Sequence, residues 1–326
     1  MKFPDAMTTP PVPASPEKSR IPVMFSATGS WGLPLGVAIH TLCLHASSGR
    51  FYDIHIVHDG MDARIIQELN QVAAPFPQVS LSFLQLPEEF RLLFQNGNKD
   101  RYSPLAYARL MAGSLFPQYG RIVYLDADVL LAGDVAELYF SDLRGASVAA
   151  AGDGLALWSI EKGTMHPHLE YMGNYLSSPL SYCNSGVLVL DLDQMRRRNL
   201  EHRLLQQLRN RPEPFPNVPS ISCGRSWKLL HMVGPEKPWR LPDAPGTMGQ
   251  FHWILYSFFW WPEAKRLPAF REELDAISQG LAPLLQRHIR GQQWKLFFSR
   301  GHIFRKRRDK IRWLKKLLSI LDGRKP

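Results

Sequence analysis

An apolar run that ends in two carboxylates constrains this chain more than any other feature. Residues 121–130 read RIVYLDADVL, so Asp126 and Asp128 follow a strand-like segment. Positions i and i+2 of a β-strand point to the same face, and both carboxylates should therefore project beyond the strand end. Hard cations such as Mg²⁺ and Mn²⁺ take oxygen ligands and often share them with phosphates. The segment predicts a metal–diphosphate site, although a turn at Asp128 and a cap at Asp126 would also explain an isolated pair.

A second polar segment, far along the chain, offers complementary groups. Residues 230–239 read LHMVGPEKPW. The imidazole of His231 is a common ligand for first-row metals, and Gly234 permits close approach of the backbone to a ligand. Lys237 supplies a compact positive charge that suits phosphate. The loop therefore indicates a metal ligand beside a phosphate-binding cation; a proline-rich turn with a surface lysine is the alternative.

A third segment places a polar group at the mouth of a buried strand. Residues 182–192 read YCNSGVLVLDL, in which an apolar run follows polar residues and a glycine. Such a run is typical of a strand that is buried on both faces. Asn184 would then stand at the strand mouth, able to donate and to accept hydrogen bonds. A plain turn before a strand is the alternative.

The order of apolar patterns predicts a parallel sheet covered by helices. Strand-like runs occur at residues 22–27, 53–58, 79–86, 121–127, 147–151 and 182–190, and helical patterns occur at 35–46, 62–73, 104–115, 194–209 and 269–286. Ligands of such sheets bind at the carboxyl ends of the strands, which is where the two carboxylates of the D-x-D fall.

Taken together, these segments resemble glycosyltransferase family 8, which includes glycogenin and bacterial lipopolysaccharide galactosyl- and glucosyltransferases. The resemblance covers roughly residues 21–268 and keeps the order of further blocks at 21–25, 35–39, 51–60, 107–110 and 133–139. It implies an α/β fold of the GT-A type for nucleotide-diphospho-sugar transferases, with a mainly parallel central sheet flanked by helices. It also implies a retaining, metal-dependent transfer of galactose or glucose from a UDP-sugar, aided by Mn²⁺ or Mg²⁺. The acceptor would be a glycan, such as a lipopolysaccharide or other cell-surface saccharide precursor.

The resemblance also assigns roles to individual residues. Asp126, Asp128 and His231 would bind the metal ion. The donor would be held by Gly234 and Lys237 at the diphosphate, by Arg109 and Asn184 at the sugar, and by Ala27, Thr28 and Trp31 at the uridine. Asp126 and Ala127 would also contact the donor. Asp153 would lie near the sugar or the acceptor and is the candidate catalytic residue.

Two departures from the family pattern bear on activity. Residues 27–31 read ATGSW, where the family has acidic or amide residues and a tyrosine; Trp31 would still stack on a flat base. The segment between Asn184 and His231 is shorter than in the family and has no D-Q-D run, and the proline-rich residues 212–219 stand there instead. The alternative function is therefore a domain that binds UDP-sugar and metal but has impaired or lost transferase activity.

Composition agrees with a globular enzyme. The chain has 326 residues, which is enough for one large core or two small ones, and 45% of them are hydrophobic and 21% charged. Cys43, Cys183 and Cys223 lack the spacing of a metal site, which fits free thiols in a reducing compartment. Residues 1–20 are rich in proline and have no apolar stretch typical of a signal peptide, so they predict a flexible leader.

The last 40 residues differ from the rest in charge. Residues 287–326 contain 14 Lys and Arg against two Asp, whereas the preceding residues have 25 basic and 27 acidic side chains. Apolar residues from Ile311 to Leu321 recur at helical spacing, which favours an amphipathic helix on an anionic membrane surface. A helix packed on residues 21–286, the predicted catalytic domain, is one alternative. Nucleic-acid binding by charge alone is another, and the presence of Asp126, Asp128, His231 and Lys237 argues against it. The expected location is the cytoplasmic face of the cytoplasmic membrane.

Overall fold

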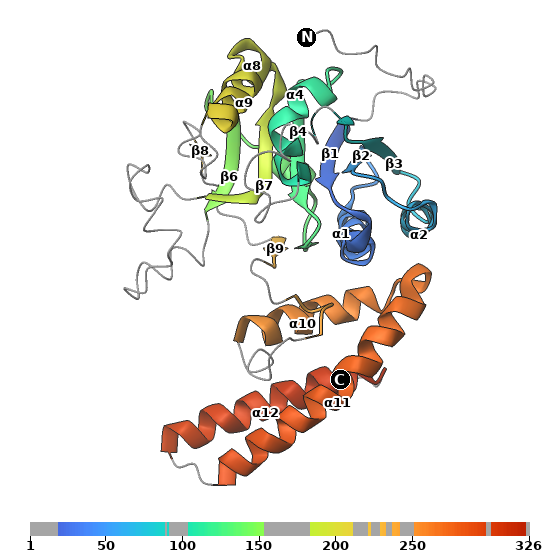
Figure 1. The fold of residues 1–326 in the computed structure, drawn as a ribbon, viewed down its shortest axis with the longest axis vertical. Helices are drawn as coiled ribbons and strands as arrows, with labels where there is room; N and C mark the ends of the chain where they lie inside the picture. Colours follow the sequence, from blue (N-terminus) through green and yellow to red (C-terminus); the bar gives the residue numbers. More distant parts are fainter. Residues whose placement is uncertain are drawn as a thin grey trace.

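The computed structural model describes residues 19–88, 90, 104–152, 183–210, 221–222, 229–232, 237–241, 251–297 and 301–323. Within these ranges a central sheet has the strand order β3-β2-β1-β4-β7-β6-β8 (Figure 1). Its strands are β1 (Arg20–Ser26), β2 (Phe51–His58), β3 (Val79–Gln85), β4 (Arg121–Asp126), β6 (Val148–Gly152), β7 (Cys183–Asp191) and β8 (Ile221–Ser222). Only β7 runs against its neighbours, β4 and β6, so the expected mainly parallel sheet is confirmed for the described strands.

Both faces of this sheet are buried, because successive apolar side chains of a strand point to opposite faces and each face packs against a core. Val23 and Phe25 of β1 belong to one core with α1 (Gly32–His45), whereas Met24 belongs to a second core on the opposite face. Strand β4 divides in the same way, with Val123 and Leu125 in the first core. This division follows from the two-residue period of a strand, and it explains why the sequence runs are almost continuously apolar.

Helical segments cover the two faces of the sheet. The first core includes residues of α1 and of α2 (Ala63–Ala73), and the second lies beside α4 (Ala112–Leu115), α8 (Leu192–Arg197) and α9 (Leu200–Asn210). Short segments complete the layers: η1 (Gly29–Trp31), η2 (Pro104–Met111) and α5 (Ala136–Tyr139).

Two helices differ from the sequence prediction. The helix expected at 104–115 is mostly the 3₁₀ segment η2, in which Leu105, Ala108 and Met111 are buried at the three-residue period of that helix. The helix expected at 194–209 is split into α8 and α9 at Asn199, whose φ of 51° lies in the left-handed region. Asparagine tolerates this conformation better than most residues, and it ends α8 there.

A separate two-stranded sheet joins distant parts of the chain. Strand β5 (Val129–Leu131) pairs antiparallel with β9 (Leu229–His231), so that Val129 lies opposite His231. The hydroxyl of Thr41 on α1 accepts a 3.2 Å hydrogen bond from the backbone N–H of Leu131. The small sheet is thereby fixed to α1.

The C-terminal segment forms a helical layer below the sheet in Figure 1. It contains α10 (Phe251–Ala264), η5 (Pro268–Phe270), α11 (Arg271–Phe297) and α12 (Gly301–Leu321). The boundary expected after residue 286 falls inside α11, which continues through it without a break. Among the described residues, none of the helices has the length and apolar character needed to cross a membrane.

The apolar face of the C-terminal helix is oriented differently from the sequence expectation. Ile311, Leu314, Leu317 and Leu321 are at most 6% exposed and belong to the core shared with α10 and α11. The Nζ of Lys265 on α10 also donates to the carbonyl of Leu321. These side chains are therefore not available to a membrane in this arrangement, because protein already covers them. The packed-helix alternative describes the structure.

Candidate metal and donor site

Two short strands bring the expected metal ligands together. Asp126 ends β4 beside Ser26 of β1, at the carboxyl end of both parallel strands. Asp128 immediately precedes β5, and its carbonyl accepts a 2.9 Å hydrogen bond from the backbone N–H of Met232. The pairing of β5 with β9 thus delivers His231 to the D-x-D from more than a hundred residues away.

The three side chains form one compact cluster. The Nε2 of His231 lies 2.9 Å from Oδ1 of Asp128 and 3.6 Å from Oδ2 of Asp126. One ligand atom from each residue lies within 4.8 Å of the other two. Two carboxylate oxygens and one imidazole nitrogen form a donor set that suits Mn²⁺, and suits Mg²⁺ when water and phosphate complete the shell.

The hydrogen bonds around His231 show which of its ring nitrogens could bind a cation. The backbone N–H of Gly186 donates to Oδ1 of Asn184 at 2.8 Å, which identifies this atom as the amide oxygen. The Nδ1 of His231 lies 2.7 Å from the same oxygen and must therefore donate to it. The Nε2 then faces two carboxylates, where its lone pair needs a proton or a cation between them. The cluster fits a divalent metal ion.

Asp126 is held in place from its other side. Its Oδ1 accepts hydrogen bonds from Arg109, at 3.0 Å, and from the hydroxyl of Tyr124, at 2.6 Å. Arg109 also donates to the carbonyls of Ala106 and Ser185, and its guanidinium lies 4.3 Å from the centre of the Tyr124 ring. These bonds leave Oδ2 of Asp126 facing His231.

Asp128 is a nearly buried carboxylate between two basic side chains. Burial alone would raise its pKa, but the hydrogen bond to His231 and the charge of Lys237 lower the pKa of Asp128 to about 2. The Nζ of Lys237 lies 2.5 Å from Oδ2 of Asp128 and also donates to the carbonyl of Met232. Both side chains are at most 10% exposed. In this structure Lys237 is thus paired with Asp128, one of the predicted metal ligands.

The loop after β1 lies beside this lysine. The Nζ of Lys237 lies 5.8 Å from the ring centre of Trp31, and the guanidinium of Arg240 lies 5.7 Å from it. The hydroxyls of Thr28 and Ser30 are hydrogen-bonded to each other at 2.9 Å. Trp31 therefore lies beside two cationic side chains, those of Lys237 and Arg240.

The remaining expected site residues divide into three groups. Ala27 and Ala127 are buried at the strand ends that carry the site. Arg109 and Asn184, expected at the donor sugar, hold Asp126 and His231 by the bonds described above. Gly234 and Asp153 lie outside the described residues.

Gly186 and Tyr124 also belong to the site, although they were not among the expected site residues. A Cβ atom on Gly186 would lie 2.2 Å from Cε1 of His231 and 2.4 Å from Oδ2 of Asp126. Only glycine permits this approach of β7 to the cluster. The signal for Gly186 was its position in the Asn-Ser-Gly segment. The signal for Tyr124 was its i, i+2 spacing from Asp126 on β4, which puts both side chains on one face of the strand.

The sheet order, and an Asp-Asp-His cluster at the carboxyl ends of its strands, define the class of the protein as an α/β fold of the GT-A type. The chain belongs to glycosyl transferase family 8, whose model matches residues 22–217. The resemblance noted from the sequence is confirmed.

Individual relatives are distant. The chain is 25% identical over 177 residues to a probable galacturonosyltransferase-like 9 of Arabidopsis thaliana, covering 51% of this chain and 44% of that protein. The structure is similar to the galactosyltransferase LgtC, solved with donor and acceptor sugar analogues, with a TM-score of 0.58 at 16% identity over 78% of this chain and 100% of LgtC. It is also similar to the bifunctional glycosyltransferase WbbM, with a TM-score of 0.59 at 19% identity over 80% of this chain and 52% of WbbM. At these identities the structural likeness concerns the fold.

Proposed function

We propose that the protein transfers a hexose, galactose or glucose, from a UDP-sugar to a glycan acceptor, with retention of configuration and with a divalent metal ion. The observation that carries the proposal is the Asp126–Asp128–His231 cluster with the ammonium of Lys237 bonded at its edge. Such a cluster at the carboxyl ends of strands is suited to a nucleoside diphosphate, whose negative charges need a cation and hydrogen-bond donors.

The residues of the chain would divide the work between binding and orientation. Asp126, Asp128 and His231 would hold Mn²⁺ or Mg²⁺, which as a Lewis acid stabilises charge on the departing UDP. Lys237 would exchange its contact with Asp128 for one with the diphosphate. Trp31 would offer a stacking surface for the uracil base.

The donor is best identified by a panel of UDP-sugars. UDP-galactose and UDP-glucose follow from the resemblance, and UDP-galacturonate follows from the name of the Arabidopsis thaliana relative. We expect Mn²⁺-dependent release of UDP from one of them, and faster release when an acceptor saccharide is present. Asp128→Ala and His231→Ala should lose Mn²⁺-dependent UDP binding in calorimetry, whereas Asp142→Ala, a carboxylate outside the site, should keep it.

The second candidate is a domain that binds UDP-sugar and metal without efficient transfer. It is favoured by the absence of a D-Q-D run in the sequence between Asn184 and His231. Tight Mn²⁺-dependent binding of UDP-sugar, with no UDP release in the presence of lipopolysaccharide core acceptors, would support it. Release that rises with acceptor concentration would exclude it.

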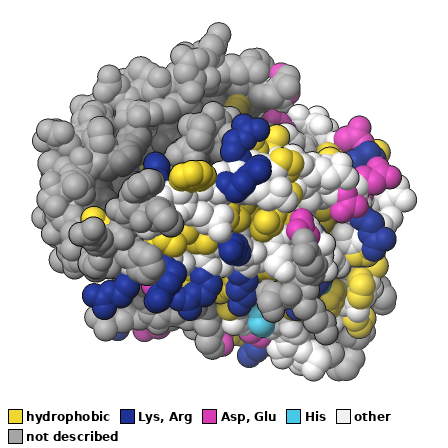
Figure 2. Space-filling view, turned by 90° about the horizontal axis from the view of Figure 1, so that it is seen from below, with side chains coloured by type: hydrophobic (Ala, Val, Ile, Leu, Met, Phe, Trp, Pro, Cys, Tyr) yellow, Lys and Arg dark blue, Asp and Glu magenta, His cyan; other side chains and the backbone are white. Residues whose placement is uncertain are grey.

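For the acceptor, we propose a lipid-linked saccharide at an anionic membrane surface, on the cytoplasmic face of the cytoplasmic membrane. The outward side of α12 presents exposed basic residues, Arg305, Lys306, Arg308, Arg312, Lys315 and Lys316. Figure 2 shows Lys and Arg side chains across this side of the molecule, with hydrophobic side chains between them. Basic side chains near such a surface contribute about 1 kcal/mol each, and salt screens the attraction.

Reversing charge tests the membrane proposal without removing packed residues. Arg305→Glu, Lys306→Glu and Arg308→Glu together should reduce sedimentation with phosphatidylglycerol vesicles and leave UDP binding unchanged. Substituting the exposed residues Arg197, Arg203 and Arg271, which lie on other elements, by Glu provides a charge-matched control. Equal loss in both variants, or none in the first, would contradict an α12 surface.

A further inference from the structure

Four tryptophan rings link the β1–α1 connection, which carries Trp31, to helix α10. The rings of Trp31 and Trp239 are 5.7 Å apart between centres, those of Trp239 and Trp260 are 5.2 Å apart, and those of Trp260 and Trp261 are 5.2 Å apart. Trp239 is 8% exposed, and Trp260 and Trp261 are fully buried. We call this set the tryptophan ladder. It runs from the β1–α1 connection, through the segment that carries Lys237, to α10.

The ammonium of Lys237 lies where the ladder meets the metal-binding cluster. Its Nζ is 5.8 Å from the ring centre of Trp31, 6.0 Å from that of Trp239 and 2.5 Å from Oδ2 of Asp128. Trp239 follows Lys237 by two residues, so the position of its ring limits where the lysine can reach. A large buried ring is a rigid support for such a segment because close packing leaves it little room to move.

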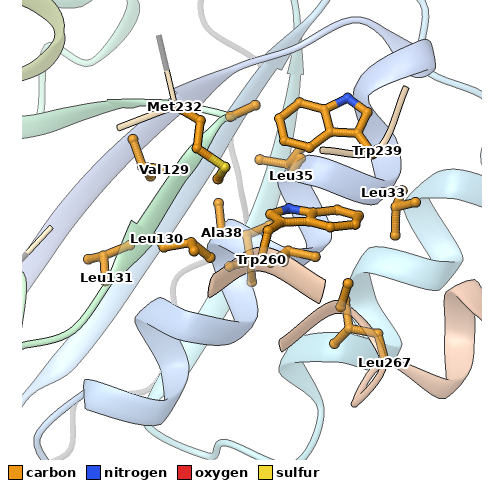
Figure 3. Close-up of a cluster of buried hydrophobic side chains, with 14 of the residues drawn as sticks. Leu33, Leu35, Ala38, Val129, Leu130, Leu131, Met232, Trp239, Trp260 and Leu267 are labelled. Carbon is orange, nitrogen blue, oxygen red and sulfur yellow. The ribbon is translucent and has the colours of Figure 1, made fainter. Parts of the chain in front are cut away.

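The ring of Trp260 packs against the ring of Trp239 and limits its movement. Figure 3 shows the two indoles close together, among Leu33 and Leu35 of α1, Val129 of β5 and Met232. Trp260 belongs to α10, which α12 in turn holds in place through the Phe258–Trp313 ring contact at 5.0 Å. The support of the segment that carries Lys237 and Trp239 therefore comes from helices that follow residue 217, the end of the family match.

We propose that Trp260 is a positioning residue for the donor site: it fixes Trp239 and thereby places the Lys237 ammonium against a nucleoside diphosphate. The inference rests on the proposed function, because it assigns Lys237 to the diphosphate. Trp260 lies on α10, outside the Asp126–Asp128–His231 cluster, and its effect passes through Trp239 to Lys237. The C-terminal helical layer is thus part of the donor-binding machinery as well as the surface that carries the basic α12.

A binding cycle with Lys237 tests this role. Calorimetry with Mn²⁺ would measure UDP and uridine affinities of wild type, Trp260→Leu, Lys237→Met and the double variant. We expect Trp260→Leu to weaken UDP binding about tenfold, in the range found for residues that support a direct ligand contact, and uridine binding much less. In the Lys237→Met background the same substitution should have little further effect on UDP affinity, because Trp260 acts through that lysine.

Two variants control for general loss of packing. Trp253 is 1% exposed on the same helix but lies outside the ladder, so Trp253→Leu should lose thermal stability without the selective loss of UDP affinity. Trp260→Phe keeps an aromatic ring and should restore most of the UDP affinity; it also replaces Trp260→Leu in the cycle if that variant does not fold.

The outcomes separate this inference from the proposed function. A wild-type protein without Mn²⁺-dependent UDP affinity would overturn both. A wild type that binds UDP, together with equal losses in Trp253→Leu and Trp260→Leu, would overturn the inference alone. So would an undiminished effect of the Trp260 substitution in the Lys237→Met background.

Discussion

The Nδ1 atom of His231 lies 2.7 Å from Oδ1 of Asn184, an oxygen that also accepts a hydrogen bond from the backbone N–H of Gly186. The backbone of β7 therefore decides which nitrogen of the imidazole faces Asp128. Because the orientation of the His231 ring is set in this way, its side chain does not lose conformational entropy when a cation binds. The N-S-G segment thus acts on the metal site through its hydrogen bonds and its glycine.

Asn184→Ala should weaken Mn²⁺-dependent UDP binding by about tenfold to a hundredfold, the usual effect of removing an outer partner of a metal-bound histidine. Asn184→Asp keeps an oxygen that can accept from both His231 and Gly186, so it should retain more affinity than Asn184→Ala. Calorimetric titration with UDP at saturating Mn²⁺ would measure both. Equal losses in the two variants would contradict an orienting role for the amide oxygen.

Gly186→Ala should abolish Mn²⁺-dependent UDP binding, because its Cβ would lie 2.2 Å from Cε1 of His231 and 2.4 Å from Oδ2 of Asp126. The neighbouring Ser185→Ala is a matched control, since the side chain of Ser185 is exposed on the same strand. Titration with UDP, and circular dichroism to check the fold, would compare them. A Gly186→Ala variant that binds UDP like Ser185→Ala would show that β7 can move away.

Lys237→Met should destabilise the protein more in the absence of metal than in its presence. Removing one partner from a buried ion pair typically costs about 3–5 kcal/mol, because the other charge remains buried. Asp128 is that remaining charge, at 10% side-chain exposure, and a bound divalent cation would neutralise it in place of Lys237. Chemical denaturation of wild type and variant, each with EDTA and with Mn²⁺, would measure the difference.

The control for this comparison is Lys295→Met, which removes an exposed lysine of α11. It should change the free energy of unfolding little, and equally in EDTA and Mn²⁺. If Mn²⁺ fails to reduce the cost of Lys237→Met, the cation and the ammonium do not neutralise the same carboxylate.

The parts of the fold that could be predicted from sequence are those with local patterns. The apolar run of β4 and the polar residues that follow it place Asp126 at a strand end without tertiary information. The C-terminal helix could be recognised from the spacing of Leu314 and Leu317. The sequence did not indicate that other helices of the protein cover these side chains. An amphipathic basic helix gives the same pattern whether its apolar face meets a membrane or protein.

In the candidate site, too, some features could be predicted from the sequence and others could not. The residues of the metal cluster could be predicted because carboxylate and imidazole groups are typical ligands of divalent metal ions. The contact of Lys237 with Asp128 joins positions 109 residues apart, and no spacing rule predicts it. The Arg109–Asp126 pair likewise depends on how η2 packs against β4.

Leu314→Ala should destabilise the protein by about 2–5 kcal/mol, the usual cost of a cavity in a core. Leu314 is fully buried in the core that α12 shares with α10 and α11. Its neighbour Lys315 is exposed on the same helix, and Lys315→Ala should have little effect. Chemical denaturation would compare the two. For the same reason, deletion of residues 301–326 should impair folding, and it would not be a clean test of membrane binding.

We expect a buried histidine outside the metal cluster, His55, to make the stability of the fold sensitive to acid. The Nδ1 of His55 lies 2.6 Å from the hydroxyl of Ser82, and its Nε2 lies 3.1 Å from that of Tyr119. Burial lowers the pKa of His55 from 6.5 to about 4, although the nearby Asp53 carboxylate opposes the shift. The imidazole of His55 therefore takes up a proton less readily in the folded protein than in the unfolded chain.

The sign of the effect on stability follows from this difference. Above pH 6.5 the imidazole is neutral in both states and stability is unaffected. As the pH falls from 6.5 towards 4, the unfolded chain takes up the proton first, and folding stability declines by about 3 kcal/mol in total. His55→Gln keeps groups that can bond to Ser82 and Tyr119 but does not titrate. The free energy of unfolding, measured by urea denaturation at pH 7.0 and pH 4.5, should therefore fall less in His55→Gln than in wild type. Parallel declines in the two proteins would show that other groups cause the acid sensitivity.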